Sequence, residues 1–220
     1  MRSAYLDIDG TLVEDGLWLR LIEQLINDDL GDKEPLLRCM ADLKSPHANG
    51  MEAVRREIPV ALKHVGSADM EAVLERAWDR VEPFPFARPL ARLLMRKGVG
   101  VILVSGAPQA LAEKVGALFG AEAVYGCVLR PGEETFDRFI GSSEAKGSLT
   151  RYVAQERDDD LGRVMAMGNG RNDVGMLEQV GFPFAFEPSG ELRREAEIHG
   201  WRITDRAHVM DDIEALSEVK

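Results

Sequence analysis

The feature that most constrains the fold is a regular alternation of short apolar runs with segments of helical spacing, which begins after Pro89. The apolar runs predict strands at residues 99–104, 123–125, 163–167 and 184–186, with a short edge strand at 201–204. The intervening segments predict helices at residues 107–119, 144–155, 173–180 and 190–199. Strands joined through helices are expected to lie parallel in one sheet with helices on both faces. The chain is therefore predicted to be an α/β protein with a doubly wound parallel sheet.

Residues 14–85 follow a different pattern, in which helical spacing occurs with no apolar run that predicts a strand. Leu17, Leu21 and Leu25 recur every four residues, as on one face of a helix. Three further helices are predicted around residues 36–43, 51–58 and 70–81. Pro59 is expected to end or bend the third of these. The sequence Pro-Phe-Pro-Phe at residues 83–86 predicts a stiff, non-helical connector.

These two patterns predict two domains. Residues 1–13 and 86–220 are predicted to form the α/β core, and residues 14–85 an all-helical domain inserted into it. The segment 128–140 contains Pro131-Gly132 between two runs and predicts a hairpin.

The charge balance and the cysteines exclude several classes of protein. The chain has 38 acidic and 27 basic residues and a net charge of −11, which argues against a general binder of nucleic acid or of anionic membranes. Cys39 and Cys127 are far apart, which indicates neither a disulfide framework nor a zinc site. Asp7 and Asp9 interrupt any apolar core of an N-terminal signal peptide. We predict a cytoplasmic protein without nucleic-acid or membrane partners; the sequence leaves its oligomeric state open.

Polar residues follow three of the predicted strands at their carboxyl ends, which is where parallel α/β sheets bind ligands. Asp7 and Asp9 end the first strand, at residues 3–8, and point the same way on an extended backbone. Paired carboxylates of this kind suit Mg²⁺. A carboxylate is also a competent nucleophile towards phosphorus.

Other polar groups at these strand ends fit the same chemistry. Ser105 supplies a hydroxyl, Gly106 permits close approach of a backbone N–H, and Lys146 supplies a positive charge. Together with a metal ion they could neutralise the oxygens of a phosphoryl group during its transfer.

Three other interpretations of these motifs fail on one or two residues each. A calcium loop starting at Asp7 would need glycine at Leu12 and glutamate at Trp18. A dinucleotide fingerprint starting at Gly168 would need glycine at Asp173. A nucleophile elbow around Ser105 would need glycine at Leu103.

The motifs, in their order along the chain, resemble those of the haloacid-dehalogenase-like (HAD) phosphohydrolases. They are Asp7-Ile8-Asp9-Gly10-Thr11, then Val104-Ser105-Gly106, then Lys146, then Gly168 with Asn172-Asp173. The helical insert resembles the C1 cap of that superfamily, and the residues around the motifs are most similar to the phosphoserine-phosphatase-like subgroup. The resemblance implies a Rossmann-like core and a Mg²⁺-dependent phosphomonoester hydrolase that acts on a small phosphorylated metabolite.

The resemblance also implies a role for each motif residue. Asp7 would be the nucleophile that forms an aspartyl-phosphate, and Asp9 the acid and base, with its carbonyl on Mg²⁺. The expected phosphate-binding residues are Thr11, Ser105, Gly106, Lys146 and Asn172. The expected metal-binding residues are Asp7, Asp9, Asn169 and Asp173.

Two positions depart from the family pattern. Asn169 stands where the family usually has a metal-binding aspartate, which predicts weaker Mg²⁺ binding or an altered metal preference. The alternative function is therefore a catalytically weak or inactive relative that binds a phosphorylated ligand or a protein. Gly16 stands nine residues after Asp7, where phosphoserine phosphatases carry a glutamate for the substrate ammonium, and this argues against phosphoserine as the substrate. Arg55 and Arg56 are candidates to hold a substrate carboxylate or second phosphate.

Overall fold

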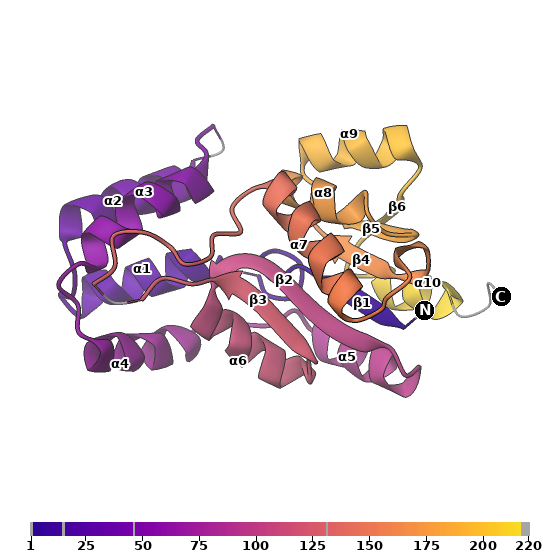
Figure 1. The fold of residues 1–220 in the computed structure, drawn as a ribbon, viewed down its shortest axis with the longest axis horizontal. Coiled ribbons are helices and arrows are strands. Elements are labelled where there is room, and N and C mark those ends of the chain that lie inside the picture. The colour runs from indigo at the N-terminus through magenta and orange to yellow at the C-terminus, as the bar shows by residue number, and fades with distance from the viewer. Residues whose placement is uncertain (1, 15, 46, 131, 217–220) are drawn as a thin grey trace.

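Six parallel strands form one sheet in the order β3-β2-β1-β4-β5-β6 (Figure 1). The computed structural model describes residues 2–14, 16–45, 47–130 and 132–216. The strands are β1 (Ser3–Leu6), β2 (Gly100–Pro108), β3 (Ala123–Cys127), β4 (Met165–Gly168), β5 (Phe182–Phe186) and β6 (Arg202–Thr204). This order is that of the doubly wound Rossmann fold, in which the strand order reverses beside β1. The predicted fold class is confirmed.

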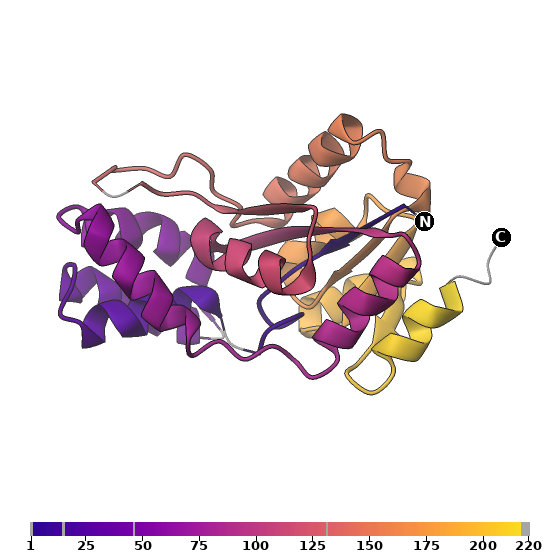
Figure 2. The same cartoon turned by 90° about the horizontal axis from the view of Figure 1, so that it is seen from below.

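Helices cover both faces of the sheet (Figure 2). One face packs against α5 (Ala87–Arg96), α6 (Gln109–Phe119) and α10 (Val209–Ala215). The other packs against α7 (Ser143–Glu156), α8 (Val174–Leu177) and α9 (Gly190–His199). Leu6 joins the first apolar cluster and Tyr5 the second, because neighbouring residues of a strand point to opposite faces. The one-turn helices η1 (Leu161–Arg163) and η2 (Arg171–Asp173) flank β4.

The helical insert consists of four helices that lie beyond the carboxyl ends of the strands (Figure 1). They are α1 (Leu17–Asn27), α2 (Lys33–Lys44), α3 (Gly50–Leu62) and α4 (Ser67–Trp78). All four were expected from the spacing of apolar residues. Leu21 and Ile58 of the insert belong to the same apolar cluster as the α5–α6–α10 face, so the insert packs continuously onto the core.

Two short segments connect the insert to the sheet, and they run side by side. The N–H of Phe84 donates to the carbonyl of Leu12 over 2.9 Å. The adjoining residues Val13 and Pro83 pair in an antiparallel bridge. The guanidinium of Arg206 lies 4.5 Å from the centre of the Phe84 ring and covers the connection from the core side. The chain therefore leaves and re-enters the core at one place.

Two local predictions differ from the structure. Pro59 was expected to end or bend the third helix of the insert; it lies inside α3, which continues to Leu62, so it does not end the helix. Its ring removes a single helical hydrogen bond, and the helix is held by the burial of its apolar face. In the segment expected to form a hairpin, the described residues contain one isolated antiparallel bridge, Val128 with Arg138, and no paired strands. Pro131 of that segment lies outside the described residues.

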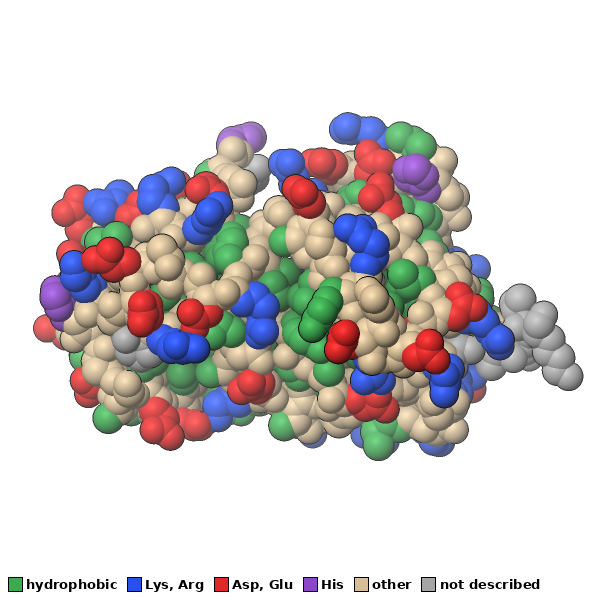
Figure 3. Space-filling model, in the orientation of Figure 1, with side chains coloured by type: hydrophobic (Ala, Val, Ile, Leu, Met, Phe, Trp, Pro, Cys, Tyr) green, Lys and Arg blue, Asp and Glu red, His purple; other side chains and the backbone are tan. Residues whose placement is uncertain are grey.

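The surface carries both signs of charge. Acidic and basic side chains are interspersed over the face shown in Figure 3. Within the described ranges, no helix is both long enough and apolar enough to cross a bilayer.

Candidate active site

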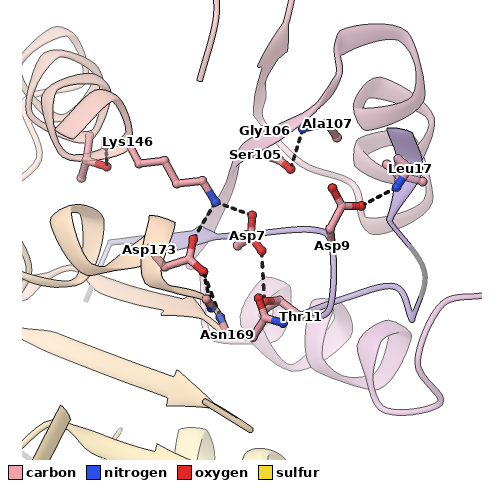
Figure 4. Close-up of polar contacts among 12 residues, drawn as sticks. Asp7, Asp9, Thr11, Leu17, Ser105, Gly106, Ala107, Lys146, Asn169 and Asp173 are labelled. Carbon is pink, nitrogen blue, oxygen red and sulfur yellow. Dashed lines mark hydrogen bonds and ion pairs between the residues drawn. The ribbon is translucent and has the colours of Figure 1, made fainter. Parts of the chain in front are cut away.

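Three buried charged side chains meet at the carboxyl end of β1 (Figure 4). The Nζ of Lys146 lies 2.5 Å from Oδ1 of Asp7 and 2.6 Å from Oδ1 of Asp173. Asp7 directly follows β1, Asp173 ends η2 after β4, and Lys146 stands in the first turn of α7. All three side chains are at most 5% exposed. The strand ends thus bring together residues that are far apart in the sequence.

Close packing of two glycines brings Lys146 to Asp173. A Cβ on Gly147 would lie 2.7 Å from the carbonyl oxygen of Gly175, and a Cβ on Gly175 would lie 2.2 Å from the carbonyl oxygen of Ser143. Only glycine permits α7 to approach α8 this closely. The hydroxyl of Ser143 accepts the N–H of Gly175 over 2.7 Å and fixes the approach.

The second carboxylate oxygen of Asp173 is bound by the loop after β4. Its Oδ2 accepts the backbone N–H of Asn169 over 3.0 Å and that of Gly170 over 2.9 Å. The carboxylate therefore contacts both this loop and Lys146, and has little freedom to turn.

The carboxylate of Asp9 is held by the first turn of the insert. Its Oδ1 accepts the backbone N–H of Leu17 over 2.9 Å. Removal from solvent, then the charge of neighbouring Asp7, raise the pKa of Asp9 to about 7. Burial, then Asp173, raise the pKa of Asp7 to about 6, although Lys146 opposes both effects. Burial lowers the pKa of Lys146, but the carboxylates of Asp173 and Asp7 outweigh it and the pKa is raised overall.

Residues 105–107, the Ser105 turn, lie within β2 but leave its regular pairing beside these carboxylates. The pairing of β2 with β3 shifts register between Val104 and Pro108. Ser105 is fully buried, and its Oγ accepts the N–H of Ala107 over 3.1 Å. On the other side of Asp7, the hydroxyl of Thr11 donates to Oδ2 over 3.2 Å.

The oxygen donors of this site fit Mg²⁺ in kind. The carboxylates of Asp7 and Asp173 lie close enough to contact one cation, the ammonium of Lys146, and Mg²⁺ takes carboxylates together with amide, backbone and water oxygens. The side chain of Asn169 lies against Gly10, where a Cβ would meet its Nδ2 at 2.0 Å. In the part of the chain that the structure describes, no three His, Cys, Asp or Glu side chains form a metal-binding cluster. A bound Mg²⁺ would therefore also draw on oxygens other than carboxylates.

The remaining candidates lie around this centre. Gly106 lies in the turn after Ser105, and Asn172 is partly buried in η2 beside Asp173. Arg55 and Arg56 are neighbours in the sequence, but their side chains contact different parts of the structure. Arg56 pairs with Glu57 and with an aspartate on the outer side of the insert. Arg55 lies 6.0 Å from the centre of the Phe139 ring and lines a cavity of about 420 Å³ between α3 and residues 134–142.

Sequence analysis missed two residues of the insert that contact the site. The backbone N–H of Leu17 holds Asp9, and the indole Nε1 of Trp18 donates to the carbonyl of Gly106 over 2.7 Å. For Leu17 a signal existed, because Gly16 begins the helix without a capping side chain and leaves the N–H groups of the first turn available. For Trp18 the sequence held no signal.

The fold and this constellation of carboxylates, lysine and serine define a HAD-type hydrolase. A family model described as haloacid dehalogenase-like hydrolase matches residues 4–178. The chain belongs to this family.

Similar curated proteins include phosphoserine phosphatases. The chain is 28% identical over 217 residues to the inhibition of morphological differentiation protein of Streptomyces azureus, covering 92% of this chain and 78% of the relative. It is 25% identical over 217 residues to phosphoserine phosphatase SerB1 of Mycobacterium tuberculosis, with coverage of 92% and 70%. It is 24% identical over 196 residues to the phosphoserine phosphatase of Methanocaldococcus jannaschii, with coverage of 87% and 88%.

Solved structures share the fold. A phospho-aspartyl intermediate analogue of phosphoserine phosphatase aligns with a TM-score of 0.70 at 18% identity, covering 93% of this chain and 94% of that chain. A substrate-bound phosphoserine phosphatase aligns with a TM-score of 0.71 at 18% identity and covers 93% of both chains. Together with the curated relatives, these matches confirm the prediction of a HAD-family phosphatase, a phosphoric monoester hydrolase similar to the phosphoserine phosphatases.

Proposed function

We propose that the protein is a Mg²⁺-dependent phosphomonoester hydrolase that works through an aspartyl-phosphate on Asp7 and acts on a small phosphorylated metabolite. The observation that carries this proposal is the contact of Lys146 with both Asp7 and Asp173, next to Asp9 and the Ser105 turn. The group contains a nucleophile, an acid, a fixed cation and a hydroxyl donor, which are the parts that phosphoryl transfer needs.

The reaction has two steps. A carboxylate oxygen of Asp7 bonds to phosphorus while the bond from phosphorus to the ester oxygen breaks, and that oxygen takes the proton of Asp9. The alcohol then leaves. Water next bonds to phosphorus and gives a proton to Asp9, while the bond between Asp7 and phosphorus breaks. The products are the alcohol and phosphate, and both aspartates return to their starting states.

The raised pKa values suit these roles. A pKa near 7 lets Asp9 give a proton in the first step and take one in the second at neutral pH. A pKa near 6 leaves Asp7 mostly ionised at the same pH, as a nucleophile must be. The N–H of Leu17 keeps the carboxyl of Asp9 in a fixed place throughout.

Phosphate binding is assigned to Thr11, Ser105, Gly106, Lys146 and Asn172, and the metal to Asp7, Asp9, Asn169 and Asp173. When bound, Mg²⁺ supplies positive charge that offsets the phosphate dianion in this acidic site. The ammonium of Lys146 supplies further positive charge from the protein itself.

We propose that the leaving group is held in the cavity of about 420 Å³ between α3 and residues 134–142, whose lining includes Ser142 at the start of α7. Arg55 lines this cavity and, among the described residues, makes no ion pair, so it is available to an anionic substituent of the substrate. Gly16, directly before α1, has no side chain that could hold an ammonium group. We therefore infer a substrate other than phosphoserine.

Hydrolysis of p-nitrophenyl phosphate with Mg²⁺ tests the proposal. Asp7→Asn removes the nucleophile, and we expect it to lower kcat at least about 10³-fold. Asp79→Asn is the matched control, because Asp79 is an exposed residue at the end of α4, and its rate should equal that of the wild type. Equal rates in wild type and Asp7→Asn would refute nucleophilic catalysis by Asp7.

A second candidate function rests on Asn169. Since an amide lacks the charge of the usual aspartate, the alternative is a weak or inactive relative that binds a phosphorylated ligand or a protein. Titration of phosphate release with Mg²⁺ separates the two. We expect Asn169→Asp to saturate at a lower Mg²⁺ concentration than the wild type. Equally tight saturation would contradict a metal-binding role for residue 169, and no release by either form would favour the alternative.

The remaining assignments complete the proposal. Residues 14–85 act as a cap over a core of residues 1–13 and 86–220; Met1, Asp15, Pro46, Pro131 and residues 217–220 of these ranges lie outside the described residues. The cytoplasmic location and the lack of a nucleic-acid partner stay predictions from the sequence.

A further inference from the structure

The first turn of α1 contacts the active site through two consecutive residues. The N–H of Leu17 donates to Asp9, and the indole Nε1 of Trp18 donates to the carbonyl of Gly106 over 2.7 Å. Asp9 belongs to the acid and base chemistry, and Gly106 to the turn assigned to phosphate. The insert therefore contacts both halves of the site directly.

The carbonyl of Gly106, which Trp18 binds, lies in the part of β2 where regular pairing with the neighbouring strands is interrupted. The last paired residue of β2 with β1 is Leu103, and the ladder with β3 is interrupted between Val104 and Pro108. The indole N–H is the single polar group of a tryptophan side chain. Trp18 is 5% exposed and Gly106 is partly buried, so water has limited access to this hydrogen bond.

The orientation of the indole is itself fixed from the core side. The ring of Phe136 meets the ring of Trp18 edge-on, with centroids 6.0 Å apart. Met51 of α3 lies over the other side of the turn, where a Cβ on Gly106 would come within 3.2 Å of its Cε. The turn is thus packed between the insert and the core.

A planar peptide unit connects this hydrogen bond to Ser105. The carbonyl of Gly106 and the N–H of Ala107 belong to the same rigid plane, so fixing one fixes the other. That N–H donates to Oγ of Ser105 over 3.1 Å. With one lone pair occupied in this way, the hydroxyl proton of Ser105 remains for an oxygen of the ligand.

We propose that Trp18 is a positioning residue that acts through the Gly106–Ala107 peptide to orient the Ser105 hydroxyl for phosphate, so that the placement of the insert sets the affinity of the turn for a phosphoryl group. This inference rests on the proposed function, which assigns Ser105 to phosphate. Trp18 itself does not touch the reacting atoms.

The first test replaces the indole with a ring that has no N–H. Trp18→Phe leaves the partly buried carbonyl of Gly106 without its indole donor, and we expect inhibition by inorganic phosphate to weaken about tenfold. The KM for p-nitrophenyl phosphate should rise similarly, while kcat stays within about twofold of the wild type. Trp201→Phe makes the same change at a partly buried residue in the loop between α9 and β6 and should leave both constants unchanged. An unchanged phosphate inhibition constant in Trp18→Phe, or a fall in kcat at constant KM, would overturn the proposal.

The second test keeps Trp18 and needs no turnover. The chain has three tryptophans, so the double variant Trp78→Phe/Trp201→Phe leaves Trp18 as the single one. Titration with inorganic phosphate should shift its emission with a midpoint equal to the phosphate dissociation constant. Phosphate binding without any change in emission would overturn the positioning role alone. Phosphate that fails to bind the wild type would overturn the proposed function as well.

Discussion

Removal of Lys146 gives the sharpest stability prediction. Lys146→Met keeps the length and the apolar stem of the side chain but removes the ammonium that lies 2.5 Å from Asp7 and 2.6 Å from Asp173. Breaking a buried pair by deleting one partner costs about 3–5 kcal/mol, because the charge left behind is neither solvated nor paired. Here two carboxylates are left behind, so we expect a loss near the upper end of that range at pH 8.

The loss should depend on pH in a defined direction. With Lys146 present, the pKa of Asp7 is already raised to about 6, and without the ammonium it rises further. At pH 5.5 Asp7 then takes a proton and the repulsion between the carboxylates disappears. The variant should therefore lose less stability at pH 5.5 than at pH 8, and added Mg²⁺ should restore part of the loss at pH 8 by replacing the missing positive charge.

Urea denaturation in EDTA and in Mg²⁺, at both pH values, measures these differences. For a chain of this size a loss of about 5 kcal/mol corresponds to a fall in Tm of roughly 10–20 °C. Lys114→Met is the matched control, since the ammonium of Lys114 pairs on the surface with Glu75, which is 62% exposed, and such pairs are worth about 0–1 kcal/mol. Equal losses in the two variants, or a loss in Lys146→Met that does not vary with pH, would refute the reasoning.

Two further predictions follow from the site. Gly168→Ala places a Cβ 2.3 Å from Cγ of Asp173, so we expect the rate of phosphate release to fall more than about tenfold. Gly190→Ala is the control, because its Cβ meets nothing within 4 Å, and it should keep the wild-type rate. Activity retained in Gly168→Ala would contradict the assigned position of Asp173. The metal-free protein should lose stability as pH rises from about 4 to 7. The pKa values in the folded state are about 6 for Asp7 and about 7 for Asp9, against a usual 3.8, so the folded state binds more protons than the unfolded state in that range. Each pKa unit of difference between the two states is worth about 1.4 kcal/mol of stability. Asp9→Asn should make this fall smaller in denaturation curves recorded in EDTA, and an unchanged fall would show that Asp9 keeps an ordinary pKa.

The centre of the site was predictable because one geometric rule governs it. In a parallel sheet the carboxyl ends of the strands lie on one edge, so Asp7 after β1 and Asp173 after β4 had to lie near each other. The sequence cannot tell that both carboxylates contact one ammonium, since that depends on how closely α7 approaches α8. The glycines at 147 and 175 decide this distance, and they carry meaning only once the two helices are known to touch.

Two core helices escaped prediction for local reasons. In α5 the spacing of Leu90 and Leu94 is helical, but Pro89 is easily taken as a boundary, although it stands in the first turn, where proline is tolerated. In α10 two buried residues, Val209 and Ile213, provide a single helical repeat, which is too little to distinguish a helix from a loop.

The contact of Trp18 with Gly106 could not be predicted for a different reason. The two residues are 88 positions apart, and neither belongs to a pattern that identifies the other. The contact depends on the docking of the insert onto the core, which is fixed by the shape of two packed surfaces rather than by local sequence. Periodicity identifies the helices of the insert but not their placement.

The pairing of the two connecting segments has a consequence for how such a protein can change. Because Val13 and Pro83 lie opposite each other, everything between them forms a module whose two ends meet. The sheet is assembled without it, since β1 pairs only with β2 and β4. A different module could be inserted at this point with the strand register intact. The first turn of α1 limits that freedom: a replacement must again supply a donor for Asp9 and one for Gly106.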